Sequence, residues 1–215
     1  MKKLGGLVVG LAVLAGLLAP SAATAQVGKN QGLVYVDVAT KDDLVKLPHV
    51  TAAFADALIS GRPYANMLAV DKVFASLNAT QRGELYAKLW LPINLNTATR
   101  AEILLIPGVG ERMAHEFEEY RPYPAMAKFR REIAKYVNAQ ELARLEQYVF
   151  VPIDLNSASA ADIMTIPGMG QRMVHEFEEY RPYPNIEKFR REIGKYVDAK
   201  EVARFERYVT IRPPS

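Results

Sequence analysis

Cysteine is absent from the 215-residue sequence, and tryptophan occurs only once. Without thiols, a disulfide framework, a zinc ribbon and thiol chemistry are all excluded. Stability must therefore come from the packing of apolar side chains. The apolar fraction of 50% and the charged fraction of 24% are those of a globular protein, so disorder is not indicated.

A long hydrophobic run is also missing. The longest, Leu4 to Leu18, has fifteen residues, whereas a membrane-spanning helix needs ~20. It follows Met1-Lys2-Lys3 and precedes Ala23-Thr24-Ala25, which is the order of charged, apolar and small residues in a secretory signal peptide. We therefore expect residues 1–25 to be a signal peptide and the mature protein, starting at Gln26, to be periplasmic or extracellular, without membrane insertion. An uncleaved N-terminal anchor is the alternative.

The sequence also lacks a marked excess of either basic or acidic residues. The chain has 27 basic and 24 acidic residues, and without Lys2 and Lys3 of the expected signal 25 basic residues remain against 24 acidic ones. Residues 93–152 carry eight of each sign, and residues 153–212 carry ten of each. Nucleic-acid-binding domains usually have a basic surplus. Binding of a polyanion would therefore depend on the local arrangement of charge.

The sequence contains three copies of a segment of about sixty residues. Residues 93–152 and 153–212 are identical at 38 of 60 positions. Residues 26–92 hold a more divergent copy, in which His49 and Thr51 stand where the later copies have glycine. Terminal repeats of an array are commonly atypical. We expect a degenerate repeat over 26–92 that keeps the fold but has lost its binding site, and two competent repeats over 93–152 and 153–215, the last ending in a short tail.

Each later copy contains Pro-Gly-x-Gly between two helical patterns. The two stretches are Ile106-Pro107-Gly108-Val109-Gly110 and Ile166-Pro167-Gly168-Met169-Gly170. Proline ends the preceding helix, and glycine permits the positive φ of a tight reversal. The pattern therefore predicts two helices joined by a hairpin. The first amides of the second helix lack intrahelical partners and lie at the positive end of its dipole, so they can bind an anion.

These residues resemble the helix-hairpin-helix family, and within it the ComEA-type domain of DNA-uptake receptors. The resemblance covers about sixty residues and occurs twice, with Ile93 to Thr99 and Ile153 to Ser159 preceding the two Pro-Gly-x-Gly stretches. It implies an all-α fold, a tandem array of such repeats, and binding of DNA through its phosphates without reading sequence. Some exported relatives, including an extrinsic subunit of the oxygen-evolving photosystem, are similar and bind protein instead.

Helix caps recur in the same register in each copy. They are Thr40, Thr99 and Ser159 for the first helix, and Asn78, Asn138 and Asp198 for the fourth. Each copy therefore predicts four short helices, with Arg-Pro-Tyr-Pro as the connector after the second in the two later copies. Tyr148 to Ile153 is expected to be an extended connection. A unit of this size is marginally stable alone, so we expect neighbouring units to share core and stack as a rigid array.

Two sets of residues are candidates for binding DNA phosphates. The first comprises the turn and the arginine that follows it: Gly108, Val109, Gly110 and Arg112, with the copies Gly168, Met169, Gly170 and Arg172. The second is a basic stripe at i, i+3 and i+7 of the third helix: Lys128, Arg131 and Lys135, with the copies Lys188, Arg191 and Lys195. A plain helix turn and a solvated charged face are the alternative interpretations. Glu116 and Glu176 are spaced to pair with the arginines of the first set.

The most favoured function is sequence-independent binding of double-stranded DNA by an exported protein. A periplasmic module that docks on a protein partner in an envelope complex is the alternative, favoured by the balanced charge and the acidic second helix. No Ser-His-Asp arrangement, nucleophile elbow or nucleotide-binding loop is present, so neither an enzyme nor a cofactor is expected. His115 and His175 have too few neighbouring carboxylates for a metal site, which needs three or four ligands.

Overall fold

The structure, a computed structural model, describes residue 28 and residues 30–212. The predicted signal peptide lies outside these residues. The described part of the chain forms twelve α-helices and six two-residue strands, so the predicted all-α class is confirmed. None of the helices in these residues has both the length and the hydropathy of a membrane-spanning segment.

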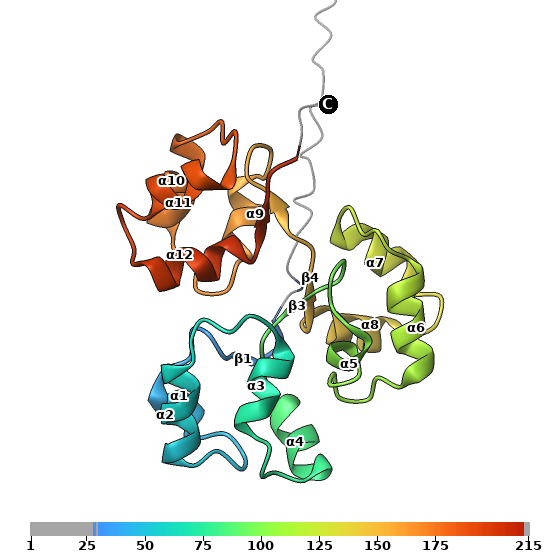
Figure 1. The fold of residues 1–215 in the computed structure, drawn as a ribbon. Helices are drawn as coiled ribbons and strands as arrows, with labels where there is room; N and C mark the ends of the chain where they lie inside the picture. Colours follow the sequence, from blue (N-terminus) through green and yellow to red (C-terminus); the bar gives the residue numbers. More distant parts are fainter. Residues whose placement is uncertain (1–27, 29, 213–215) are drawn as a thin grey trace, which may run out of the picture.

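Four helices between two short strands form a unit, and three such units follow one another along the chain (Figure 1). Unit 1 consists of β1 (Val34–Tyr35), α1 (Lys41–Leu44), α2 (Ala52–Ser60), α3 (Met67–Val73), α4 (Ala79–Tyr86) and β2 (Leu89–Trp90). Unit 2 consists of β3 (Ile93–Asn94), α5 (Arg100–Ile103), α6 (Glu111–Glu119), α7 (Met126–Ile133), α8 (Ala139–Glu146) and β4 (Val149–Phe150). Unit 3 consists of β5 (Ile153–Asp154), α9 (Ala160–Met164), α10 (Gln171–Glu179), α11 (Ile186–Ile193), α12 (Ala199–Glu206) and β6 (Val209–Thr210).

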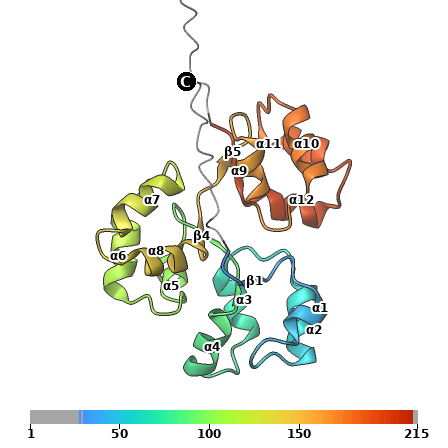
Figure 2. The ribbon, with the colours of Figure 1, turned by 180° about the vertical axis from the view of Figure 1, so that it is seen from behind.

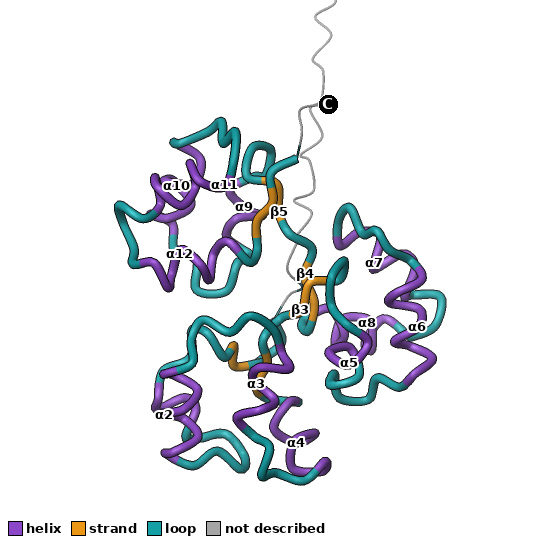
Figure 3. Tube along the Cα trace, in the orientation of Figure 1, coloured by secondary structure: helices purple, strands orange, loops and turns teal. Residues whose placement is uncertain are grey.

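The strands join the beginning of each unit to its end. β1 pairs with β2, β3 with β4 and β5 with β6, and all three pairs are parallel. In unit 2, Ile93 lies opposite Val149 and Asn94 opposite Phe150. The connection from Tyr148 to Ile153 is extended as predicted, but its pairing with the start of the unit was not foreseen. The three pairs lie near the middle of the molecule, with the helices outside them (Figure 3).

Local sequence sets where the helices begin. Capping boxes open α1, α4, α5 and α9, and Asn138 and Asp198 cap α8 and α12. In α5, the Glu102 carboxylate accepts a hydrogen bond of 3.0 Å from the Thr99 amide, while the Thr99 hydroxyl accepts from the Glu102 amide. The predicted caps are therefore confirmed.

Asn96 ties the start of unit 2 to the Arg-Pro-Tyr-Pro connector. Its side chain accepts a hydrogen bond of 2.6 Å from the Tyr123 amide and donates one of 2.9 Å to the Tyr123 carbonyl. Arg121 donates to the carbonyls of Leu95 and Ala98, both at 2.6 Å. Unit 3 repeats these contacts through Asn156 and Arg181. The asparagine of the repeated motif therefore has a structural role.

Two hydrophobic cores hold the three units. Units 1 and 2 share one core, whereas most of the second core belongs to unit 3. Trp90 lies at the boundary of units 1 and 2, where its indole nitrogen donates to the Tyr148 carbonyl at 2.9 Å. Figures 1 and 2 show the units as three lobes around the strands, with unit 1 beside both others. The expected sharing of core between neighbours is extensive for units 1 and 2, whereas unit 2 contributes only Phe150 to the core of unit 3.

Candidate functional site

The turns before α6 and α10 have the same backbone shape. Gly108 has a φ of 79° and Gly168 a φ of 75°, in the left-handed region that glycine adopts without steric cost. The residue after each glycine, Val109 or Met169, is 9% exposed and fills the space beside the turn. The glycines themselves are exposed. Each turn is therefore anchored by one apolar side chain and presents its backbone at the surface.

The helices that follow these turns begin without a side-chain cap. Gly110 and Gly170 occupy the cap positions of α6 and α10, and no side chain accepts a hydrogen bond there. Nine of the twelve helices in the described part do have such a cap. The first amides of α6 and α10 thus lack a side-chain acceptor at the positive end of a nine-residue helix, which favours a bound anion.

Unit 1 keeps the turn but fills it with its own side chains. His49 stands at the position of Gly108 and has a φ of 62°. Thr51 stands at the position of Gly110, and its hydroxyl accepts a hydrogen bond of 3.2 Å from the Phe54 amide. The His49 ring nitrogen lies 2.6 Å from a Glu84 carboxylate oxygen. An anion would therefore meet a filled cap and a carboxylate at this turn.

An arginine that the sequence analysis missed lies beside the turn of unit 2. A Cβ atom at Gly108 would come 3.4 Å from the Nη2 atom of Arg144, on α8. Glu141 orients this guanidinium through two hydrogen bonds of 2.7 Å, which also raise the pKa of Arg144. Arg204 has the same place in unit 3. The arginine recurs at the same position in both later copies, and this recurrence was the signal that could have found it. The sequence does not reveal that α8 packs beside the turn.

The predicted arginines after the turns are exposed. Arg112, Gly110, Glu116 and Tyr136 are among the residues that line a small open pocket of about 250 Å³. Among the ion pairs of the described residues there is none between Arg112 and Glu116, so that predicted pair is wrong. The Glu116 carboxylate instead contributes, after Tyr120, to a raised pKa of Tyr136 through hydrogen bonding.

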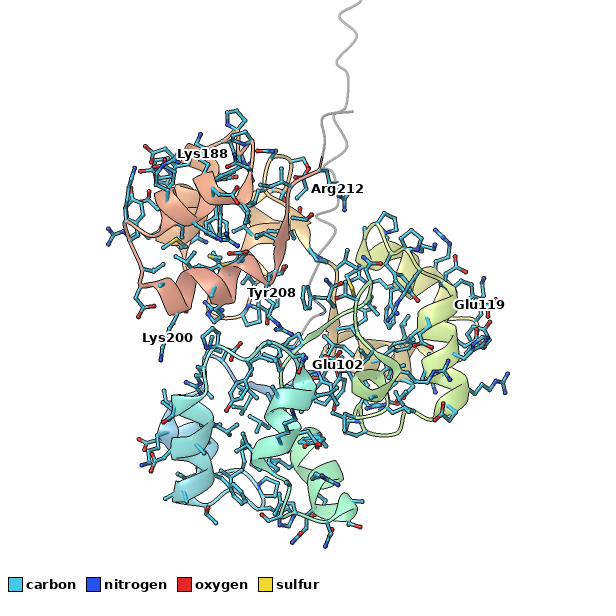
Figure 4. All side chains as sticks on the ribbon, in the orientation of Figure 1. Glu102, Glu119, Lys188, Lys200, Tyr208 and Arg212 are labelled. Atoms are coloured by element: carbon cyan, nitrogen blue, oxygen red, sulfur yellow. The ribbon has the colours of Figure 1, made fainter. Side chains whose placement is uncertain are left out.

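Acidic residues on α6 are largely paired. Arg100 lies 3.0 Å from Glu111 and 2.5 Å from Glu118. His115 lies 2.8 Å from Glu119, which Figure 4 shows on the outer side of α6. No group of three or more His, Cys, Asp or Glu side chains that could hold a metal ion occurs in residue 28 and residues 30–212. The acidic charge of α6 is thus partly neutralised near the turn.

The basic stripe of α7 is less available than its spacing implies. Arg131 lies 2.6 Å from the Glu132 carboxylate, and Lys135 forms a second ion pair with it. These contacts lower the pKa of Glu132, the one with Lys135 most. Lys128 donates to the Pro122 carbonyl at 3.0 Å. In unit 3, Lys188, Arg191 and Lys195 make the same kinds of contact, and Figure 4 shows Lys188 at the outer edge.

The two glycine turns differ in how far they are covered. A Cβ atom at Gly168 would come 2.8 Å from the Cγ1 atom of Val38 in unit 1. A Cβ atom at Gly108 would have only Arg144 within 4 Å. Pro167 is buried and Pro107 is half-buried. Val38 therefore lies against one side of the unit 3 turn, while the glycines of both turns remain exposed. The Pro-Gly-x-Gly motifs of the two copies predict no difference between the turns.

Comparison with known proteins gives one distant similarity. No family model and no solved structure matches the chain. The chain is 29% identical to the endonuclease/exonuclease/phosphatase family domain-containing protein 1 of Xenopus laevis, over 41% of this chain and 21% of that protein. The chain thus spans about a fifth of that relative's length. Because the relative is named for a family of enzymes, the match contradicts the prediction that the chain is not an enzyme, and that exclusion is withdrawn.

Proposed function

We propose that the chain is an exported tandem helix-hairpin-helix protein of the ComEA type that binds double-stranded DNA through its backbone phosphates. The observation that carries this proposal is the open turn of unit 2, where uncapped amides of α6 lie at an exposed glycine corner beside Arg144. A phosphate at this corner would accept hydrogen bonds from the amides, and Arg144 and Arg112 would supply positive charge. Contacts of this kind position a duplex without reading its bases.

Two further observations support a polyanionic partner. Unit 1 differs from unit 2 at both components of the corner, since Thr51 caps its helix and Glu84 replaces the arginine. The relative's printed name combines endonuclease, exonuclease and phosphatase, which are all classes of enzyme that act on phosphate esters. Both observations favour DNA over an uncharged ligand.

Docking on an envelope protein is the second candidate. It is favoured by a groove of about 870 Å³ between units 1 and 3, lined by apolar residues such as Tyr64 and Val202 together with four charged ones, Arg190, Asp198, Glu206 and Arg207. The near-balance of charge, 27 basic against 24 acidic residues, fits this candidate as well. A protein-docking module would bind its partner without the steep salt dependence of phosphate contacts.

The experiment that tests the proposal replaces Gly110 by aspartate. Gly110 has a φ of −105° and an added Cβ would meet nothing within 4 Å, so the fold tolerates a side chain there. The new carboxylate would cap α6 and repel phosphate. We expect wild-type protein to bind random-sequence duplex with an affinity that falls steeply with salt, and Gly110→Asp to bind at least ~10-fold more weakly.

Gly110→Ser is the matched control, because serine caps the helix without adding charge. Its loss of affinity should be smaller than that of the aspartate variant, and both variants should be at least as stable to heat as wild type. No duplex binding at low salt, or equal binding by Gly110→Asp, would overturn the DNA proposal and favour protein docking.

A further inference from the structure

A cluster of polar and aromatic side chains joins α6 to the segment after α7 in unit 2. Arg112, Glu116 and Tyr120 are four residues apart, so they lie along one face of α6 and its end. The Tyr120 hydroxyl lies 2.8 Å from that of Tyr136. The Nζ atom of Lys135 lies 4.9 Å from the centre of the Tyr120 ring. We call these five residues the tyrosine cluster.

Unit 3 repeats the tyrosine cluster, whereas unit 1 lacks it. In unit 3 the hydroxyls of Tyr180 and Tyr196 are 2.7 Å apart. The second helix of unit 1 and its end have small residues at the three corresponding positions, which are Ala53, Ala57 and Gly61. Unit 1 nevertheless forms the same four helices between two strands. The fold of a unit therefore does not require the cluster.

The ring of Tyr136 is accessible in unit 2. It is 37% exposed, and with Arg112, Met113 and Glu116 it lines the open pocket of about 250 Å³. In the part of the chain that the structure describes, no lysine or arginine lies over this ring, although Lys135 lies over its partner. The volume is just below the range of pockets that hold drug-sized ligands. The pocket therefore suits a single planar ring system.

Unit 3 shows that a planar group fits on the tyrosine at this position. The Arg172 guanidinium lies 5.8 Å from the centre of the Tyr196 ring, and guanidinium groups stack on aromatic faces. Arg112 is exposed and does not lie over Tyr136. A flat ligand on Tyr136 would therefore lie between this ring and the Arg112 side chain.

Glu116 supplies a hydrogen-bond acceptor to the pocket, and it forms no ion pair with another described residue. Its counterpart in unit 3, Glu176, is 7% exposed, and the Oε2 atom of Glu176 is buried without a hydrogen-bond partner. An unpartnered carboxylate oxygen costs free energy when it is buried. Unit 1 avoids this cost with Ala57. The carboxylate of the two later units therefore points to a ligand that donates a hydrogen bond.

We propose that the pocket of unit 2 binds one unpaired nucleobase of DNA, stacked on Tyr136, with an amino group of the base donating to Glu116. Proteins hold single strands by stacking bases on aromatic side chains, and a carboxylate accepts from the amino group of cytosine. The inference rests on the proposed function for its ligand, DNA, because the pocket includes Gly110 of the corner proposed for phosphate. The preferred substrate is then a duplex with a single-stranded end.

The test compares duplexes that differ only at one end. The end is blunt, or carries an overhang of cytosines, of thymines, or of abasic sugars with the same phosphates. We expect the cytosine overhang to bind ~10-fold more tightly than the abasic one, because stacking of a base contributes about this factor. Thymine stacks but has no amino group, so its affinity should lie between these two.

Variants of Tyr136 distinguish stacking from a structural role. Tyr136→Leu removes the aromatic surface, so affinity for the cytosine overhang should fall by ~10-fold while that for blunt duplex stays unchanged. Tyr136→Phe loses only the contact with the Tyr120 hydroxyl and should bind both DNAs like wild type. Tyr196→Leu is the matched control, because Arg172 already lies over that ring. Glu116→Gln should remove the preference for cytosine over thymine.

These outcomes separate the two proposals. Equal binding of the cytosine and abasic overhangs, in a protein that binds blunt duplex, would overturn the base pocket and leave the DNA proposal intact. Binding of the cytosine overhang without any binding of blunt duplex would overturn duplex binding and keep the pocket. Equal losses in Tyr136→Leu and Tyr196→Leu, or a loss that is the same for overhang and blunt duplex, would overturn the role of Tyr136.

Discussion

At the scale of single residues, the residue at the end of the turn decides whether the first helix amides have a side-chain acceptor. In unit 1 the helix is capped, because the Thr51 hydroxyl accepts a hydrogen bond from the Phe54 amide. Units 2 and 3 have glycine at this position and no side-chain cap. Under the proposed function, this hydroxyl would distinguish a turn that serves only the fold from a turn whose amides are free to donate to phosphate.

Arg144 gives the first prediction at this scale. Replacement by glutamine removes the charge beside Gly108, so DNA affinity should fall by ~3- to 10-fold. The number of phosphate contacts inferred from the salt dependence of binding should fall by about one. Titration at several salt concentrations measures both quantities. Arg130→Gln is the control, because Arg130 pairs with Glu146 at 3.0 Å and does not lie within 4 Å of a Cβ built at Gly108. If the two substitutions weaken DNA binding equally, Arg144 is not part of the binding site.

Asn96 gives a second prediction, which concerns stability alone. Asn96→Ala removes two hydrogen bonds to the Tyr123 backbone and should lower the free energy of unfolding by ~1–3 kcal/mol. Denaturant unfolding measures this loss. DNA affinity at a temperature where the variant is folded should match wild type. A stable variant with weakened DNA binding would instead place Asn96 in the interface.

At the scale of helices, the charge of α7 is set by its neighbours as much as by its own sequence. Glu132 is 7% exposed and pairs with both Arg131 and Lys135. Glu192 has the same position in α11. A stripe of three cations therefore has a smaller field than the count of its charges indicates.

Glu132→Gln tests this arrangement. The substitution keeps the shape of the side chain and releases Arg131 and Lys135 from their carboxylate. If α7 faces DNA, affinity should rise by ~3-fold or more at low salt and the salt dependence should steepen. A duplex titration at two ionic strengths measures the change. Unaltered affinity would mean that the stripe is a solvated face and that the turn acts without it.

Local elements were largely predictable from the sequence, because their causes are local. The capping box of Thr99 and the turn at Gly108 depend on residues within a few positions of each other. The position of Arg144 was not predictable, since packing of α8 brings it to a turn from a distant part of the chain. The strand pairs and the contact of Val38 with Gly168 depend likewise on long-range packing, which repeat spacing does not encode.

At the scale of the whole molecule, units 1 and 3 meet at a partly buried carboxylate, that of Asp37, which lines a small pocket with Lys200 and Arg204. Asp37 stands where the later copies have Asn96 and Asn156, and accepts a hydrogen bond of 3.2 Å from the Tyr64 amide. Burial raises its pKa, and this effect exceeds the opposing effects of the Tyr64 amide and of Arg207, Arg204 and Arg62. The charged form of Asp37 therefore weakens the folded molecule.

Asp37→Asn should consequently stabilise the protein at neutral pH. The favourable contribution of Asp37 is complete below its ordinary pKa of 3.8 and is lost as the pH rises through the raised value. A gain of ~1 kcal/mol corresponds to a rise in Tm of ~2–4 °C for a chain of this length, and it should shrink toward pH 4. Thermal unfolding of both proteins at pH 7 and pH 4 checks this. A lower Tm for the variant at pH 7 would show that attraction between the Asp37 carboxylate and Arg207, Arg204 and Arg62 outweighs the cost of its burial.

The central claim is that the amides at the start of α6 bind backbone phosphate. The most direct test records the amide resonances of the protein while random-sequence duplex is added at low salt. The account predicts that the largest shifts fall on Gly110, Glu111 and Arg112 and disappear at high salt. Shifts confined to other surfaces, with these three amides unchanged, would contradict it.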